Sequence, residues 1–234
     1  MGRSVLVTGG NRGIGLAIGR RLAAGGDSVT VTSRSGEPVE GLAVVRCDVR
    51  DAASVDAAFA AVEAEQGPVE VLVANAGVTR DKLLALMSED DFAAVLDTNL
   101  AGAYRVARRA VRGMVRMRRG RLIFISSVVG LYGSAGQANY AASKAGLVGL
   151  ARSLARELGS RGITSNVIAP GFVDSDMTAG LPEDRKAAIL TAVPLGRYAS
   201  ADEVASVVAF LASQDAAYIT GAIIPVDGGL GMGH

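Results

Sequence analysis

Ser4-Val-Leu-Val-Thr-Gly-Gly-Asn-Arg-Gly-Ile-Gly15 joins a short apolar run to a glycine-rich turn, and Leu16-Ala-Ile-Gly-Arg-Arg-Leu22 continues it with a helical pattern. Glycines let backbone N–H groups approach a pyrophosphate, and the amino terminus of a helix adds partial positive charge. The spacing Gly9-x-x-x-Gly13-x-Gly15 differs from G-x-G-x-x-G, so the turn alone is also compatible with a merely structural role. Its position between a strand and a helix favours a dinucleotide site.

Short strand-like runs alternate with alanine-rich helical segments along the whole chain. Several runs, such as Leu122-Ile-Phe-Ile125, are continuously apolar, which indicates parallel strands covered on both faces and joined by right-handed crossovers. We therefore predict one α/β domain over residues 1–234, a doubly wound sheet of seven parallel strands in the order 3-2-1-4-5-6-7 with helices on both faces. The predicted strands are Ser4–Val7, Ser28–Ser33, Ala43–Cys47, Val69–Ala74, Arg121–Ser126, Thr164–Ala169 and Ala222–Val226.

Two further local patterns refine this expectation. A hydroxyl residue followed three positions later by an acid predicts helix starts at Ser88 and Ser200. The segment 170–199 lacks a clear pattern and follows a predicted strand, so we expect it to form a lid over substrate.

Composition excludes several classes of function. The 24 Lys and Arg side chains nearly balance 23 Asp and Glu, so the overall field predicts neither a nucleic acid nor an anionic membrane surface as partner. No apolar stretch approaches the ~20 residues of a membrane span, so we expect no membrane insertion. The single Cys47 excludes an internal disulfide and is interpreted as a small buried hydrophobe rather than a reactive thiol. One Cys and one His argue against a metal site. We expect a cytoplasmic protein.

Tyr140 and Lys144 carry the chemistry that the sequence predicts most directly. Residues at i and i+4 share one helix face, so the ammonium of Lys144 can favour the phenolate of Tyr140. Lowering the pKa of a phenol by ~3 units requires ~4 kcal/mol, which this ammonium and a bound cationic nicotinamide could together supply. Ser127, at the end of an apolar run, is predicted to hold the substrate oxygen.

The residues after the second and third strands predict which dinucleotide binds. Ser33 and Arg34 stand where an NAD-specific protein would place an acid, and Arg12 lies in the glycine turn. Two guanidiniums able to bind a 2′-phosphate predict NADPH, and two solvated surface arginines are the alternative. Asp48 either accepts a hydrogen bond from the adenine amino group or caps the following helix.

Six motifs in register resemble the short-chain dehydrogenases/reductases, a Rossmann-type family, over essentially the entire chain. They are Thr8-Gly-x-x-x-Gly-x-Gly15, Asn75-Ala-Gly77, Asn99, Ser127, Tyr140-x-x-x-Lys144 and Pro170-Gly171. Within the family, residues 125–130, 136–144 and 225–229 are similar to the 3-oxoacyl-(acyl-carrier-protein) reductases. The tail 228–234 is similar to the actinobacterial members, including the mycobacterial long-chain type.

The resemblance implies NADPH-dependent reduction of a 3-oxoacyl thioester on acyl carrier protein to the 3-hydroxyacyl product, as in fatty acid elongation. It implies that Tyr140 donates the proton, Ser127 binds the substrate oxygen, Lys144 binds the nicotinamide ribose and Asn99 holds a relay water. A helix kink is the alternative role for Asn99. The implied cofactor-binding residues are Gly9, Asn11, Arg12, Gly13, Ile14, Gly15, Arg34, Asp48, Val49, Asn75, Ala76, Gly77, Tyr140, Lys144, Pro170, Gly171, Val173 and Ser175, the last where the family often has Thr.

Partners are expected on two surfaces. Eight arginines lie between Arg105 and Arg121, either as a solvated helix face or as a patch that steers an acidic carrier protein. By resemblance, Arg118 and Arg161 match the docking arginines of the family. The family uses the helix that matches Asn139 to about Leu158 and the final strand in a homotetramer, so the resemblance implies one here, and packing within one subunit is the alternative.

Other functions fit these residues less well or share them. A serine hydrolase would need a G-x-S-x-G elbow and a histidine base, and the only histidine is His234. A dinucleotide-binding regulator would not need Tyr140 with Lys144. A polyketide ketoreductase or a secondary-alcohol dehydrogenase stays open, as does acyl chain length. The residues that line an acyl channel or simply pack the lid are Leu131, Tyr132, Phe172 and Met177.

Overall fold

One parallel sheet runs through the part of the chain that the computed structural model describes, residues 2–174 and 183–232. Its seven strands lie in the order β3-β2-β1-β4-β5-β6-β7 and every neighbouring pair is parallel. This confirms the predicted topology, with strand ends shifted by at most two residues. The strands are β1 (Ser4–Val7), β2 (Ser28–Ser33), β3 (Ala43–Arg46), β4 (Val71–Ala74), β5 (Gly120–Ile125), β6 (Ile163–Pro170) and β7 (Ile223–Val226).

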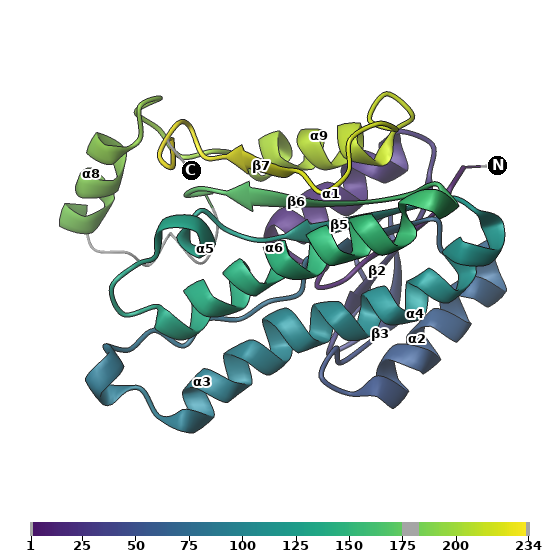
Figure 1. Ribbon diagram of the computed structural model, residues 1–234, viewed down its shortest axis with the longest axis horizontal. Helices are drawn as coiled ribbons and strands as arrows, with labels where there is room; N and C mark the ends of the chain where they lie inside the picture. The colour runs from purple at the N-terminus through teal and green to yellow at the C-terminus, as the bar shows by residue number, and fades with distance from the viewer. Residues whose placement is uncertain (1, 175–182, 233–234) are drawn as a thin grey trace.

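Helices cover both faces of the sheet (Figure 1). Helices α1 and α9 pack against one face, and α2, α4 and α6 pack against the other. The α-helices are α1 (Gly13–Ala24), α2 (Ala52–Gln66), α3 (Glu89–Leu96), α4 (Gly102–Met117), α5 (Val129–Tyr132), α6 (Ala138–Leu158), α8 (Glu183–Ala192) and α9 (Ala201–Ala212). The short turns are the 3-10 turns η1 (Leu84–Leu86) and η3 (Gly159–Arg161) and the π-helical turn η2 (Asp97–Ala101).

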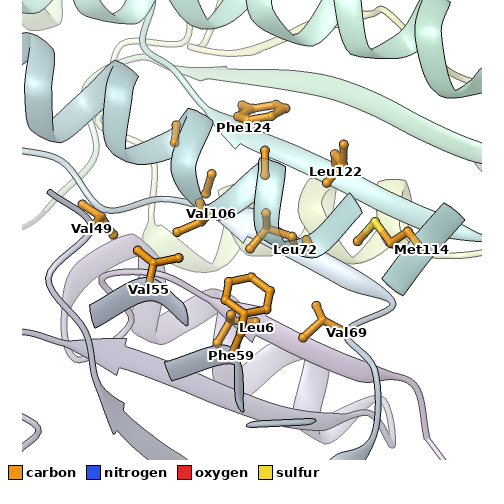
Figure 2. Packing of buried hydrophobic residues seen from close by; sticks show 14 of the residues in the cluster. Leu6, Val49, Val55, Phe59, Val69, Leu72, Val106, Met114, Leu122 and Phe124 are labelled. Atoms are coloured by element: carbon orange, nitrogen blue, oxygen red, sulfur yellow. The ribbon is translucent and has the colours of Figure 1, made fainter. Parts of the chain in front are cut away.

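Two apolar cores, one on each face, fix the sheet between these helix layers. On the face of α2 and α4, Phe59 packs with Leu6 and Leu72 of adjacent strands, as Figure 2 shows. Val5 and Val71 point to the opposite core, which α1 and α9 close. Because successive side chains of a strand alternate between faces, the continuously apolar runs of the sequence fill both cores.

The motifs predicted to carry catalysis gather at the carboxyl ends of the strands. The arrowheads of β5 to β7 in Figure 1 point to the end of the molecule where α5 lies and α6 begins. Helix α8 lies at the same end, inside the segment predicted to form a lid. Residues 175–182 of that segment lie outside the described chain. No helix among the described residues is long and apolar enough to span a bilayer.

Both predicted helix starts are N-caps in the structure. The Ser88 hydroxyl accepts from the N–H of Asp91 at 3.1 Å. The Ser200 hydroxyl accepts from the N–H of Glu203 at 3.3 Å, and the Glu203 carboxylate accepts from the N–H of Ser200 at 2.8 Å, which completes a capping box. Arg197 also pairs with Glu203 at 2.7 Å.

Ser200→Ala should lower the free energy of unfolding by ~1 kcal/mol, because the first turn of α9 loses its side-chain acceptor. Urea denaturation followed by circular dichroism measures this change. The matched variant is Ser153→Ala, which removes an exposed hydroxyl from the middle of α6. Equal losses in the two variants would show that the cap contributes nothing specific.

Candidate active site

A cavity of about 950 Å³ runs across the carboxyl ends of the strands, from the glycine turn to Tyr140. It brings together every predicted cofactor-binding residue in the described chain, and Ser127 as well. Ser175 lies outside the described residues. The cavity also contains Phe172, predicted for an acyl channel, and residues that the sequence did not assign to the site, namely Thr32, Ser35, Arg50, Val78, Thr98, Ile125 and Ser126.

Tyr140, Ser127 and Lys144 converge at one end of this cavity. Ser127 follows β5, whereas Tyr140 and Lys144 lie one turn apart near the start of α6. Ser127 lies close enough to the Tyr140 hydroxyl to lower its pKa. Lys144 is only 4% exposed, its Nζ lies 5.6 Å from the centre of the Tyr140 ring, and it donates to the Ile125 carbonyl at 2.7 Å. Two hydroxyls and a buried amine therefore meet at one point of the wall.

The pKa values differ from the simple expectation of a phenol made acidic by its neighbour. Burial raises the pKa of Tyr140 above its usual value of 10.0, and Ser127 opposes this rise only in part. Burial also lowers the pKa of Lys144 from 10.5 to about 8. Burial therefore outweighs the groups that favour the phenolate and keeps Tyr140 protonated, as a proton donor requires.

Hydrogen bonds from neighbouring polar residues hold the start of α6 against the sheet. The Ser126 hydroxyl donates to the Lys144 carbonyl at 2.9 Å, which ties the residue after β5 to the helix. The Ser143 hydroxyl donates to the Tyr140 carbonyl at 2.7 Å. Asn139 is fully buried and its side-chain oxygen accepts from the N–H of Tyr140 at 2.7 Å. The sequence prediction gave Asn139 and Ser143 no role. Their place inside the Tyr140 motif is the signal that indicates one.

Asn99 lies in the π-helical turn η2 between α3 and α4 and does not line the cavity. Its side chain accepts from the N–H of Val78 at 2.8 Å and donates to the carbonyl of Val78 at 3.0 Å. It also donates to the Ser143 hydroxyl at 3.0 Å. The side chain thus holds the segment after β4 against α6. The π-helical turn is a local irregularity of the helix, which agrees with the alternative role of Asn99 at a helix kink.

The glycine turn is shaped by backbone conformation and by two polar braces. Gly9 and Gly13 have φ values of 64° and 53°, in the left-handed region that favours glycine. The Asn75 amide donates to the carbonyls of Thr8 and Gly9, both at 3.0 Å. The Thr8 hydroxyl accepts from the N–H groups of Asn75 and Ala76, both at 3.1 Å. Asn75 therefore fixes the turn as well as lining the cavity.

The far end of the cavity, beyond the glycine turn, is rich in guanidiniums. Arg12 and Arg34 are exposed and line it, and neither pairs with an acid in the described chain. Asp48 lies beside them, and the alternative that it caps the next helix is wrong, because Asp51 is the N-cap of α2 and accepts from Ala53 at 2.9 Å. The carboxylate of Asp48 binds Arg50 instead.

Cys47 is 4% exposed and also contributes to the cavity wall. Burial raises the pKa of its thiol to about 11. A thiol that stays protonated is a poor nucleophile, which supports the interpretation of Cys47 as a small buried hydrophobe.

An apolar hollow of about 340 Å³ adjoins the catalytic end, and Phe172 lines both this hollow and the main cavity. Of the residues predicted to line an acyl channel, Tyr132 and Phe172 contribute to it. Leu131 does not, and Met177 lies outside the described chain. The other walls come from α8 and the tail, through Ala188, Ile189, Ala192 and Leu230.

The arginines between 105 and 121 divide into distinct groups. Arg105, Arg109 and Arg119 pair with nearby acids, at 2.7 Å, 2.7 Å and 2.8 Å. Arg118 has a φ of 52° and donates to the Ser160 carbonyl at 3.1 Å, which brings it beside the turn that contains Arg161. The exposed arginines of α4 form a stripe at four-residue spacing, Arg108, Arg112 and Arg116.

Comparison with known proteins agrees with this arrangement. A family model described as enoyl-(acyl carrier protein) reductase matches residues 9–231, nearly the whole chain. The 3-oxoacyl-(acyl-carrier-protein) reductase MabA of Mycobacterium tuberculosis (strain ATCC 25618 / H37Rv) is 58% identical over 232 residues, which cover 99% of this chain and 94% of the relative. This chain is a member of the short-chain dehydrogenase/reductase family.

Further relatives within the short-chain dehydrogenases/reductases carry the same activity in their names. The MabA protein of Mycobacterium avium is 56% identical over 99% of this chain and 91% of its own length. The 3-oxoacyl-(acyl-carrier-protein) reductase FabG of Escherichia coli (strain K12) is 48% identical over 99% of this chain and 98% of its own length. Members of this family are oxidoreductases that use nicotinamide cofactors. No group of three metal-ligating side chains occurs among the described residues.

Lys144→Met should change how stability depends on pH. Between pH 8 and 10.5 the unfolded chain binds the lysine proton and the folded chain does not, so the stability of the native protein rises with pH there. Below pH 8 both states bind the proton, and the full cost of burying the charge remains. The variant lacks this dependence, so its stability advantage should shrink by about 2 kcal/mol from pH 7 to 9.5.

Urea unfolding of both proteins at one protein concentration, repeated across this pH range, measures that difference. Circular dichroism at each pH checks that the variant is folded before urea is added. Parallel pH profiles for the two proteins would contradict a lowered pKa for Lys144.

Proposed function

We propose that this protein reduces 3-oxoacyl-(acyl-carrier-protein) to the 3-hydroxyacyl product with NADPH, in the elongation cycle of fatty acid biosynthesis. The observation that carries this proposal is the meeting of Ser127, Tyr140 and Lys144 at one end of a cavity lined by the glycine turn. The relatives named for this activity support it over nearly the full chain. A reducing cytoplasmic location agrees with the buried, unpaired Cys47.

The chemistry needs a proton donor and a hydrogen-bond donor at the same oxygen. The nicotinamide cofactor, when bound, supplies the hydride that goes to C3 of the substrate. Ser127 orients the 3-oxo oxygen, and Tyr140 gives it the proton, so that a hydroxyl rather than an alkoxide leaves the site. Lys144 stabilises the phenolate that Tyr140 then carries, because its buried ammonium lies one helical turn from Tyr140. Asn99 is proposed to complete the proton relay by holding a water near Lys144.

The residues at the far end of the cavity fit NADPH. A 2′-phosphate is a dianion, and Arg12 and Arg34 line the wall without acid partners of their own. Ser33, where NAD-specific proteins place an acid, is a neutral residue on the same wall. The glycine turn, with left-handed Gly9 and Gly13, leaves room for a pyrophosphate at the start of α1.

The apolar hollow beside Phe172 is proposed to receive the acyl chain. Its walls are carbon-rich, and it opens next to the end of the cavity where Tyr140 lies. Burying methylene groups against such walls stabilises a complex by about 0.8 kcal/mol for each group. Part of the predicted lid, α8, forms one wall of the hollow.

The carrier protein is proposed to dock at Arg118 and Arg161, and we propose that this docking depends on a homotetramer. Both arginines lie near the amino ends of β5 and β6, whereas Tyr140 lies near the opposite end of α6. At 1.5 Å per helical residue, the helix rises about 27 Å from Tyr140 to Leu158. In a homotetramer, a two-fold axis across α6 would bring the arginines of one subunit near the catalytic end of its partner.

Two rival reactions share this fold. Reduction of an enoyl thioester is suggested by the description of the matching family model. Hydride addition there forms an enolate whose oxygen would accept from Ser127 and Tyr140, and the proton ends on carbon rather than on oxygen, so turnover rather than these two residues separates the reactions. A polyketide ketoreductase or a secondary-alcohol dehydrogenase would use the same three residues. Turnover of a 3-oxoacyl, an enoyl and a simple ketone substrate distinguishes these reactions.

Tyr140→Phe should abolish most of the NADPH oxidation driven by acetoacetyl thioester, by ~100-fold or more in kcat, because the proton donor is lost while the ring is kept. Absorbance at 340 nm measures the rate, with NADPH and NADH compared for the native protein. NADPH binding, followed by its fluorescence, should be nearly unchanged.

The control is Tyr218→Phe, a fully exposed ring away from the cavity, which should keep the native rate. Native turnover by Tyr140→Phe would contradict the mechanism. Equal or better use of NADH by the native protein would contradict the cofactor assignment, and preference for the enoyl substrate would favour the rival.

Arg118→Glu should reduce kcat/KM for a carrier-bound substrate about tenfold or more, because a docking cation becomes a repelling anion. The rate with a small thioester analogue should stay within about twofold, since the site itself is untouched. Arg20→Glu, with the same charge change on the exposed face of α1, is the matched control. Equal losses on both substrates would remove the docking role, and light scattering would show whether the variant keeps its oligomeric state.

A further inference from the structure

Arg50 occupies the guanidinium-rich end of the cavity, although no motif in the sequence points to it. It follows β3 by four residues and lines the same wall as Arg34 and Asp48. About half of its side chain is exposed, 47%, and 31% of the Asp48 side chain is exposed. This end of the cavity therefore holds three guanidiniums, counting Arg12, and a single carboxylate.

The carboxylate of Asp48 accepts hydrogen bonds along one edge of the Arg50 guanidinium. Nε of Arg50 donates to both carboxylate oxygens, at 2.9 Å and 3.1 Å, and Nη2 donates to Oδ2 at 2.5 Å. The backbone N–H of Arg50 donates to Oδ1 at 3.0 Å as well. The hydrogen bond from Arg50 is the main cause that lowers the pKa of Asp48 to about 2, so the carboxylate stays charged at neutral pH.

This pairing decides which part of each group is left for a ligand. The carboxylate of Asp48 is largely engaged by Arg50, so it is a weaker candidate to accept from a base. The guanidinium of Arg50 has its edge fixed and its planar faces left over, and such faces stack on aromatic rings. An exposed ion pair contributes little to stability, so its place on the cavity wall is not explained by folding.

We propose that Arg50 binds the adenine ring of the cofactor through the face of its guanidinium, and that Asp48 is the residue that positions it. This inference rests on the proposed dinucleotide-dependent function. It assigns to Arg50 the base contact first expected of Asp48. Because stacking involves the base alone, the contribution of Arg50 is the same for NADPH and NADH.

Titration calorimetry and nucleotide fluorescence test this with Arg50→Thr and Arg50→Lys. Both variants should raise the Kd of NADPH and of NADH by one common factor, roughly two- to thirtyfold. Lys should not rescue, because an ammonium keeps the charge without the plane. Reduced nicotinamide mononucleotide, which lacks adenine, should support the native rate in both variants.

Asp48→Asn provides the second arm. It should weaken both dinucleotides, and combining it with Arg50→Thr should add little, because the two residues act as one unit. Circular dichroism and the unchanged mononucleotide rate show that the variants are folded.

Several outcomes would overturn the assignment. A loss of affinity confined to NADPH would show that Arg50 binds the 2′-phosphate. Rescue of the affinity by Lys would show that only the positive charge of Arg50 matters. An equal loss with the mononucleotide would show a structural defect. Failure of the native protein to bind either dinucleotide would instead overturn the proposed function itself, which separates the two failures.

Discussion

The buried ammonium of Lys144 is the constraint on which the rest of the site depends. A charge removed from water requires fixed partners, and Lys144 finds one in the Ile125 carbonyl at the last residue of β5. The end of β5 and the first turns of α6 must therefore keep one relative position. Ser127 lies two residues beyond Ile125, and Tyr140 lies one turn before Lys144, so the same constraint places both hydroxyls.

Neighbouring contacts hold the start of α6 against the end of β5, and burying the Lys144 amine there costs stability. Ser126 binds the Lys144 carbonyl, and Gly130 packs so closely that a Cβ there would lie 2.8 Å from the Cβ of Lys144. Asn99 joins α6, through Ser143, to the segment that follows β4. These contacts form a rigid frame around an amine whose lowered pKa records the free energy spent on burying it.

The topology of the sheet explains why the cofactor cavity and this frame meet. The chain builds the sheet outward from β1 to β3 on one side and from β4 onward on the other, so the strand order switches between β1 and β4. The connections after β1 and β4 lead to opposite faces of the sheet, which leaves a crevice beyond the carboxyl ends of these two strands. The glycine turn follows β1, and Asn75 follows β4 and braces that turn across the crevice. Residues after β2 and β3, including Arg34 and Asp48, close one end, and residues after β5 close the other.

The sequence by itself determined the strands and the facing pair Tyr140 and Lys144, because apolar runs, glycine turns and helical pitch act over a few neighbouring residues. The strand order followed from the rules for parallel sheets with right-handed crossovers, applied to the alternation of strands and helices. It also marked the caps at Ser88 and Ser200. Only the tertiary structure decided that Asp48 binds Arg50 while Asp51 caps α2, and that the pKa of Tyr140 rises. Burial and side-chain pairing depend on which distant segments pack together, and that information does not lie in any local pattern.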